Sequence, residues 1–205
     1  MKSNQRQHGK RIESSFTPNR PDETDWEARW APYDPPTYQA VLDLIQPADV
    51  VLEIGAGDFG LARQIARVAR QVIAIEIQEA LYRQAMATPA AHLPDNLIMV
   101  LGDARMVPIP PGITTGVLLM RHCRHFRLYA EKLKAAGYRS LITNARWRMG
   151  VEQVLLQAPR LSYREIKMGW YACWCGKAGF KPGPAEQYTP ELDAVISEVT
   201  DCPDC

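Results

Sequence analysis

Short apolar runs alternate with amphipathic stretches through the middle of the chain. Apolar residues at consecutive positions are typical of strands that are buried on both faces of a sheet. Such runs occupy residues 50–54, 72–77, 97–101, 116–120 and 140–143. Helices are predicted before and between them, at residues 37–45, 61–70, 78–87 and 127–136. Strands that alternate with helices in this order predict an α/β fold with a doubly wound, mostly parallel sheet.

The C-terminal part of the chain shows a different pattern. Residues 163–167 and 170–175, joined at Gly169, predict a closing hairpin, which brings the expected number of strands to seven. A last helix is expected over residues 189–199. The polar and basic residues 1–20 have no hydrophobic period and predict a loose tail, so a single domain is expected over 21–205.

Composition narrows the class of protein further. The chain has 205 residues, with 24 basic and 23 acidic side chains and a net charge of +1. This balance excludes a globally basic nucleic-acid protein but allows a local basic patch. No apolar run reaches the length of a membrane span, and the N-terminus lacks the apolar core of a secretory signal. We therefore expect a cytoplasmic monomer with no membrane partner, whose five cysteines are thiols or metal ligands.

A glycine-rich turn follows the first predicted strand. Gly55-Ala56-Gly57-Asp58-Phe59-Gly60 links this strand to a helix, and glycines there permit a sharp turn and a close approach of a ligand to the backbone. Glu76 ends the next strand, about where a dinucleotide-binding motif has the acid that binds the ribose. The spacing alone fits either a dinucleotide or S-adenosylmethionine.

Acidic side chains around the turn favour S-adenosylmethionine. Glu53 precedes Gly55 by two residues, and Asp58 lies inside the turn. A pyrophosphate would meet both carboxylates, and each at roughly 4–6 Å costs on the order of a kcal/mol or more. S-adenosylmethionine has no phosphate and carries a sulfonium and an ammonium group, which carboxylates attract. Asp103 follows the third strand, where its carboxylate can accept a hydrogen bond from the adenine amino group. The candidate cofactor-binding residues are Glu53, Gly55, Gly57, Glu76 and Asp103.

Three motifs in register resemble those of class I S-adenosylmethionine-dependent methyltransferases. They are Val51-Leu52-Glu53-Ile54-Gly55-Ala56-Gly57, Ile75-Glu76 and Gly102-Asp103-Ala104, within a resemblance that covers roughly residues 37–143. The first two motifs are most similar to those of the rRNA adenine dimethyltransferase family. The resemblance implies a Rossmann-like methyltransferase fold, with S-adenosylmethionine as methyl donor and RNA as the first expected acceptor.

The segment after the fourth strand departs from that family. Adenine N-methyltransferases have Asn or Asp, Pro and an aromatic residue there, whereas this chain reads Met120-Arg121-His122-Cys123-Arg124-His125-Phe126-Arg127. Residues 121–150 contain eight Lys or Arg and a single acid, Glu131, so they predict a basic patch that positions phosphates. The ligand is then RNA or an anionic small molecule, and a non-catalytic RNA-binding protein that keeps the fold is a further interpretation. Arg121 and His122 are the candidate catalytic residues, since they follow the strand and imidazole exchanges protons near neutral pH.

Four cysteines form two close pairs near the C-terminus. They are Cys173, Cys175, Cys202 and Cys205. Cys-x-x-Cys is a common half of a zinc site, and four thiolates complete a tetrahedral, structural one. This interpretation makes residues 173–205 a zinc-stapled segment. The other interpretation, two strand cysteines and a separate redox-capable pair, stays open at this point.

Overall fold

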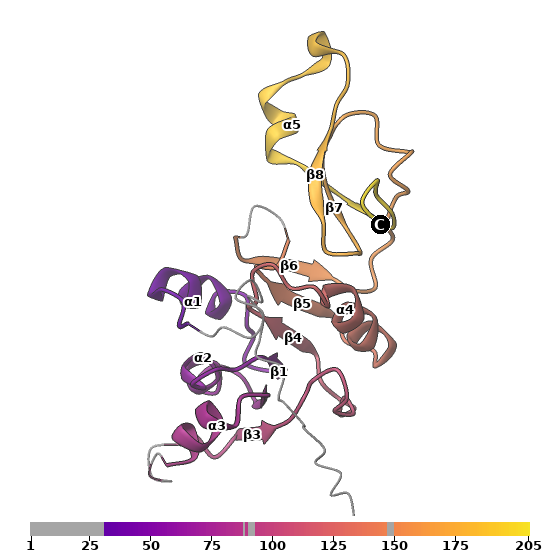
Figure 1. Ribbon diagram of the computed structural model, residues 1–205. Helices are drawn as coiled ribbons and strands as arrows, with labels where there is room; N and C mark the ends of the chain where they lie inside the picture. Colours follow the sequence, from indigo (N-terminus) through magenta and orange to yellow (C-terminus); the bar gives the residue numbers. More distant parts are fainter. Residues whose placement is uncertain (1–30, 88, 90–92, 147–149) are drawn as a thin grey trace, which may run out of the picture.

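A six-stranded sheet forms from the apolar runs and is the centre of the fold (Figure 1). The computed structural model describes residues 31–87, 89, 93–146 and 150–205, so the predicted tail 1–20 lies outside the described residues. The strand order is β3-β2-β1-β4-β5-β6; every neighbouring pair is parallel except β5 and β6. The strands are β1 (Val50–Ile54), β2 (Gln71–Glu76), β3 (Leu97–Leu101), β4 (Thr115–Leu118), β5 (Ser140–Thr143) and β6 (Glu152–Leu155).

Helices cover both faces of this sheet. The side chain of Val51 packs with α1, α2 and α3, whereas Leu52 and Ile54 pack with α4 on the opposite face. Successive side chains of a strand point to opposite faces, so one buried strand supplies both cores. Figure 1 shows α1, α2 and α3 on one side of the strands and α4 on the other. The helices are α1 (Pro35–Leu42), α2 (Gly60–Ile65), α3 (Glu79–Met86) and α4 (Phe126–Ala135).

A second, smaller sheet contains the C-terminal strands. Its order is β8-β7-β9, with β7 antiparallel to β8 and parallel to β9. Figure 1 shows it beyond the β6 edge of the main sheet, together with the short helix α5. Its elements are β7 (Gly169–Cys173), β8 (Ala178–Lys181), η4 (Ala185–Gln187), α5 (Pro190–Ala194) and β9 (Ile196–Val199).

The doubly wound, mostly parallel α/β fold is confirmed, but the details of the C-terminal part are corrected. The main sheet has six strands rather than seven, and the predicted closing hairpin belongs to the separate small sheet. The hairpin partner of β7 is β8, not residues 163–167, because the chain reverses at the turn over 174–177, where Gly176 has a φ of +99°. The predicted last helix ends at Ala194, and residues 196–199 form β9 instead.

No helix within the described ranges combines the length and apolar character needed to cross a bilayer. The division into one domain over 21–205 stays a prediction.

Candidate functional site

A cavity of about 450 Å³ lies at the carboxyl ends of β1 and β2. The strand order reverses between β1 and β4, and ligands of open α/β sheets bind in the crevice at such a point. The residues predicted from the sequence that line this cavity are Glu53, Gly55, Glu76, Arg121 and His122. The fold therefore brings three cofactor candidates and both catalytic candidates to one place.

Hydrogen bonds hold the glycine turn against the end of β2. The backbone N–H of Gly57 donates to Oε2 of Glu76 at 2.7 Å, and that of Gln78 donates to Oε1 at 2.7 Å. Gly55 and Gly57 have φ of +74° and +59°, a conformation that strains any residue with a side chain. A Cβ on Gly55 would also lie 3.2 Å from Cε of Met120. The turn thus leaves backbone at the cavity wall, and each Glu76 oxygen keeps a lone pair for a ligand hydroxyl.

Two buried carboxylates lie at opposite ends of β1, and their surroundings differ. Asp49, just before the strand, accepts hydrogen bonds from the Gln46 N–H, from the Thr114 hydroxyl and from the Arg139 guanidinium, at 2.6–2.8 Å. Glu53, near the end of the strand, is 4% exposed, and its Oε2 is buried with no hydrogen-bond partner among the described residues. A buried acceptor without a partner is costly. The end of β1 at the cavity is therefore incomplete as it stands and fits a ligand that brings a positive charge or a donor.

The electrostatics of the cavity also favour a ligand with a positive charge. Burial raises the pKa of Glu53 to about 8, and the negative charges of Asp58 and Glu76 add to the shift. Near neutral pH the carboxyl is therefore largely protonated until a cation approaches. A diphosphate would add negative charge to this group of acids, whereas an ammonium or sulfonium group would neutralise it.

Asp103, unlike Glu53 and Glu76, has its carboxylate paired with a neighbouring side chain outside the cavity. Its carboxylate forms an ion pair with Arg105 at 2.7 Å and is not among the residues that line the cavity. This contact lowers the pKa of Asp103, chiefly through the hydrogen bond from Arg105. The guanidinium of Arg105 also lies 3.4 Å from Nε2 of His125. The structure thus separates Asp103 from the cavity that contains Glu53 and Glu76.

Aromatic residues that the sequence did not single out complete the cavity. Tyr33 and Tyr38, before and within α1, line it together with Met120. The Arg121 guanidinium lies 5.3 Å from the centre of the Tyr33 ring, and the Arg121 N–H donates to the Tyr33 hydroxyl at 3.3 Å. His122 is exposed and has a φ of +62°, which is uncommon for a residue with a side chain. Nothing in the spacing of Tyr33 reveals this position, because it depends on how the chain enters α1.

The predicted basic patch is smaller in the folded protein than in the sequence. Lys132 donates to three backbone carbonyls, those of Ala104, Arg105 and Val107. Arg127 pairs with Glu131, Arg139 pairs with Asp49, and Arg146 is buried with two carboxylates. Arg121 is exposed and lines the cavity, and the exposed Arg124 follows it by three residues in the chain.

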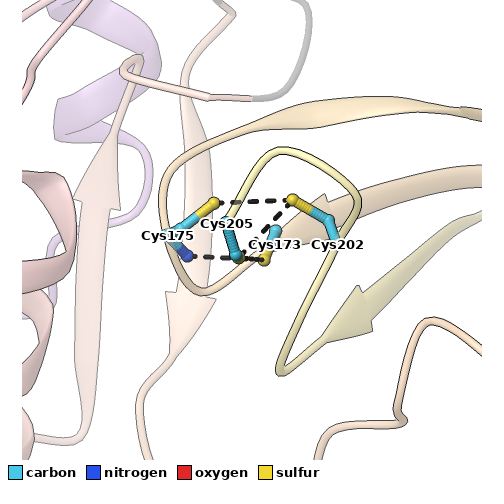
Figure 2. A group of neighbouring side chains, drawn as sticks. All are labelled: Cys173, Cys175, Cys202 and Cys205. Atoms are coloured by element: carbon cyan, nitrogen blue, oxygen red, sulfur yellow. Dashed lines mark hydrogen bonds between the residues drawn. The ribbon is translucent and has the colours of Figure 1, made fainter.

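The four cysteines converge, although their two pairs are far apart in the sequence. Figure 2 shows them between the β7–β8 turn and the loop after β9. The sulfurs lie within 4.8 Å of one another, with 3.5 Å between Cys173 and Cys205 and 3.6 Å both from Cys175 to Cys202 and from Cys202 to Cys205. The Cys175 N–H lies 3.5 Å from the Cys173 sulfur. Burial raises the pKa of Cys173, and it raises that of Cys202 to about 11. Such a group is suited to a cation that binds thiolates.

Comparison with known proteins adds to this geometry. No protein-family model matches the chain. A probable ribosomal RNA small subunit methyltransferase A from Methanosarcina mazei is 38% identical over 66 residues, which are 32% of this chain. The predicted resemblance to rRNA methyltransferases is confirmed. The matched part spans 24% of the length of that methyltransferase, about a quarter.

Solved methyltransferase structures are also similar to part of this chain. A dimethyladenosine transferase from Plasmodium falciparum is 20% identical with a TM-score of 0.48, and the match covers 54% of this chain and 41% of that one. The 23S rRNA methyltransferase ErmE is 23% identical with a TM-score of 0.48, and the match covers 54% of this chain and 46% of that one.

Proposed function

We propose that this protein is an S-adenosylmethionine-dependent methyltransferase. The observation that carries the proposal is the buried, unpaired carboxylate of Glu53 at a glycine-turn cavity, at the reversal point of the parallel sheet. The curated match to an rRNA methyltransferase supports it.

The residues of the cavity fit the chemistry of this cofactor. Glu53 offers an acceptor for a cationic group, and Glu76 offers acceptors for ribose hydroxyls, while Gly55 brings no side chain into the space. When bound, S-adenosylmethionine supplies an electrophilic methyl group. Arg121 and His122 face the same cavity from the segment after β4. In this proposal Arg121 orients an anionic acceptor, and His122 accepts the proton that the acceptor atom loses.

RNA is the proposed acceptor. Arg121 at the cavity and the exposed Arg124 three residues later suit contacts to phosphates, and the curated relative is by name an rRNA methyltransferase. An anionic small molecule is the second candidate, because Arg121 at the cavity also suits a single phosphate or carboxylate. The cytoplasmic location and the monomeric state stay predictions.

Calorimetry with S-adenosylhomocysteine tests the cofactor step. Binding of its ammonium group beside Glu53 favours the carboxylate form, so we expect binding with release of up to one proton at pH 7. The enthalpy measured in two buffers of different ionisation enthalpy reports that proton. No binding at millimolar concentration would reject the proposal, and NAD serves as the control ligand.

The acceptor requires a separate experiment. Labelled cofactor is incubated with the protein and a cell extract, which is then split into RNA, protein and small-molecule fractions. Label in RNA supports the proposed acceptor, and label in small molecules alone rejects it. Cofactor-independent, salt-sensitive RNA binding without any transfer would indicate the non-catalytic alternative.

We further propose that the four cysteines bind a structural zinc ion. A tetrahedral site with Zn–S bonds of about 2.3 Å has sulfurs about 3.8 Å apart, close to the 3.5–3.6 Å distances here. A disulfide would need a sulfur–sulfur distance of about 2.05 Å. Elemental analysis of the purified protein tests this, with one zinc per chain expected. Cys123, outside the group, gives the matched control Cys123→Ser, which should keep its zinc.

A further inference from the structure

The loop that contains Cys175 packs directly on the start of helix α4, which follows the predicted acceptor residues. Gly176 adjoins Phe126, the first residue of α4: a Cβ on this glycine would lie 3.0 Å from the Cβ of Phe126. Phe126 is fully buried and directly follows the segment 121–125, which includes Arg121 and His122. The position of the cysteine loop therefore bears on the start of α4.

The neighbouring Trp174 extends this contact. Its ring packs against the core beneath α4. The Arg160 guanidinium lies 4.0 Å from the ring centre, and the Lys134 ammonium lies 5.5 Å from it. Cations this close to an aromatic ring are attracted to its face and help to fix its position. The loop between Cys173 and Cys175 is thus anchored to the main sheet by its own central residue.

A second connection starts from β9, just before Cys202. Glu198 accepts hydrogen bonds from Arg146 at 2.5 and 3.0 Å, and the Arg160 Nε lies 3.5 Å from it. Arg146 follows β5, its side chain is fully buried, and it also pairs with Glu152 on β6 at 2.9 and 3.1 Å. Its guanidinium lies 5.4 Å from the centre of the Phe126 ring. Both connections therefore meet at Phe126.

We infer that the cysteine group, with its metal, holds the acceptor side of the catalytic cavity in position. The inference rests on the proposed zinc binding and on the proposed methyltransferase function. One metal joins the β7–β8 turn to the loop after β9, and these two segments separately hold the start of α4 and the residues after β5. Arg146 and Glu198 are positioning residues in this arrangement. The cofactor side, formed by β1, β2 and the glycine turn, lies outside both connections.

Hydrogen exchange of the full chain, with zinc bound and after its removal by a chelator, tests the inference. Metal removal should speed exchange at least tenfold in residues 121–127 and 144–146, and leave residues 50–60 unchanged. The affinity for S-adenosylhomocysteine should change less than twofold. A rise in exchange confined to residues 169–205 would overturn the inference, and so would a protein that binds no zinc.

A variant that keeps all four cysteines tests the inference without the risk that the whole protein unfolds. Glu198→Gln should retain one zinc per chain and still raise exchange in residues 144–146, whereas Glu186→Gln, on the exposed η4, should change neither. In a transfer assay with RNA, Glu198→Gln should raise the KM for RNA about tenfold with little change in the KM for the cofactor. Unchanged exchange in Glu198→Gln would overturn the inference. Failure to bind S-adenosylhomocysteine would instead reject the proposed function. The exchange result would then still decide whether the metal positions residues 121–127 and 144–146.

Discussion

The two sheets of this protein are stabilised by different means. The main sheet buries apolar side chains on both faces, from β1 outward to β2 and β4. The small sheet buries Ile166, Tyr171 and Val199 with two of the four cysteines, Cys173 and Cys202. A large core tolerates an unpaired carboxylate at its edge, whereas a small one depends on a crosslink or a metal. The main sheet therefore contains the candidate site, and the small sheet is the part that the proposed ion would stabilise.

Loss of the proposed metal ligands should have the largest effect, and it should separate the stability of the small sheet from that of the main sheet. In Cys173→Ser/Cys202→Ser we expect complete loss of zinc and loss of order in the small sheet, while the main sheet stays folded. Metal binding by such sites corresponds to on the order of 10 kcal/mol of apparent free energy, and the small core cannot replace it. Elemental analysis and circular dichroism measure both effects. A double variant as stable as wild type would show that the small sheet needs no ion.

Glu53→Gln should have the next largest effect, with opposite signs for binding and stability. Loss of the charge should weaken S-adenosylhomocysteine binding by about 2–3 kcal/mol, on the order of 30- to 150-fold. The ligand-free protein should gain about 4 kcal/mol of unfolding free energy at pH 8, because at this pH Glu53 ionises readily in the unfolded chain but not in its buried position. Calorimetry and urea denaturation measure these quantities. The matched control is Glu79→Gln on α3, which removes an exposed acid paired with Arg83; it should leave binding unchanged and cost about 0.5 kcal/mol of stability or less.

The pH dependence of stability should follow from the same carboxyl. The pKa of Glu53 is raised in the folded state to about 8, so folding is favoured by its protonation. This contribution is fully present below about pH 4.5 and is lost as the pH rises through 8. The unfolding free energy should therefore fall by about 1 kcal/mol per pH unit between pH 5.5 and 7.5 relative to Glu53→Gln. Parallel pH curves for the two proteins would contradict the assignment of this pKa.

Asp103→Asn should have the smallest effect. Because Arg105 already binds this carboxylate outside the cavity, we expect a loss of less than threefold in cofactor affinity. The partly exposed ion pair should contribute about 0.5 kcal/mol or less to stability. Calorimetry and thermal denaturation provide the two values. A tenfold loss of affinity would show that the carboxylate turns toward the ligand, as the sequence motif suggests.

Local sequence patterns were sufficient for the main sheet. Strands β1 to β5 lie within two residues of their predicted positions, since consecutive apolar residues bounded by glycines and polar turns have few other structures. Helix α4 differs by one residue at each end from its predicted range. Helix α1 begins at Pro35, two residues before its predicted start at residue 37, because Asp34 caps it and its side chain accepts the Thr37 N–H.

The same patterns were not sufficient for the C-terminal part. Strand β6 has Val154 as its one fully buried position, so its signal is weak. The apolar spacing near the C-terminus fitted a helix, but residues 196–199 pair with β7. Whether such a segment becomes helix or strand is decided by the neighbour that covers it, and a single chain pattern does not specify that neighbour.

The sequence by itself determined the α/β fold, the glycine turn and the group of acids at the ends of β1 and β2. These follow from local rules, namely strand burial, backbone freedom at glycine and the sign of side-chain charge. Only the tertiary structure decided which acids share a cavity, that Asp103 turns to Arg105, and that four cysteines from two distant segments meet. Contacts between segments far apart in the chain depend on how whole elements pack, so no local pattern encodes them.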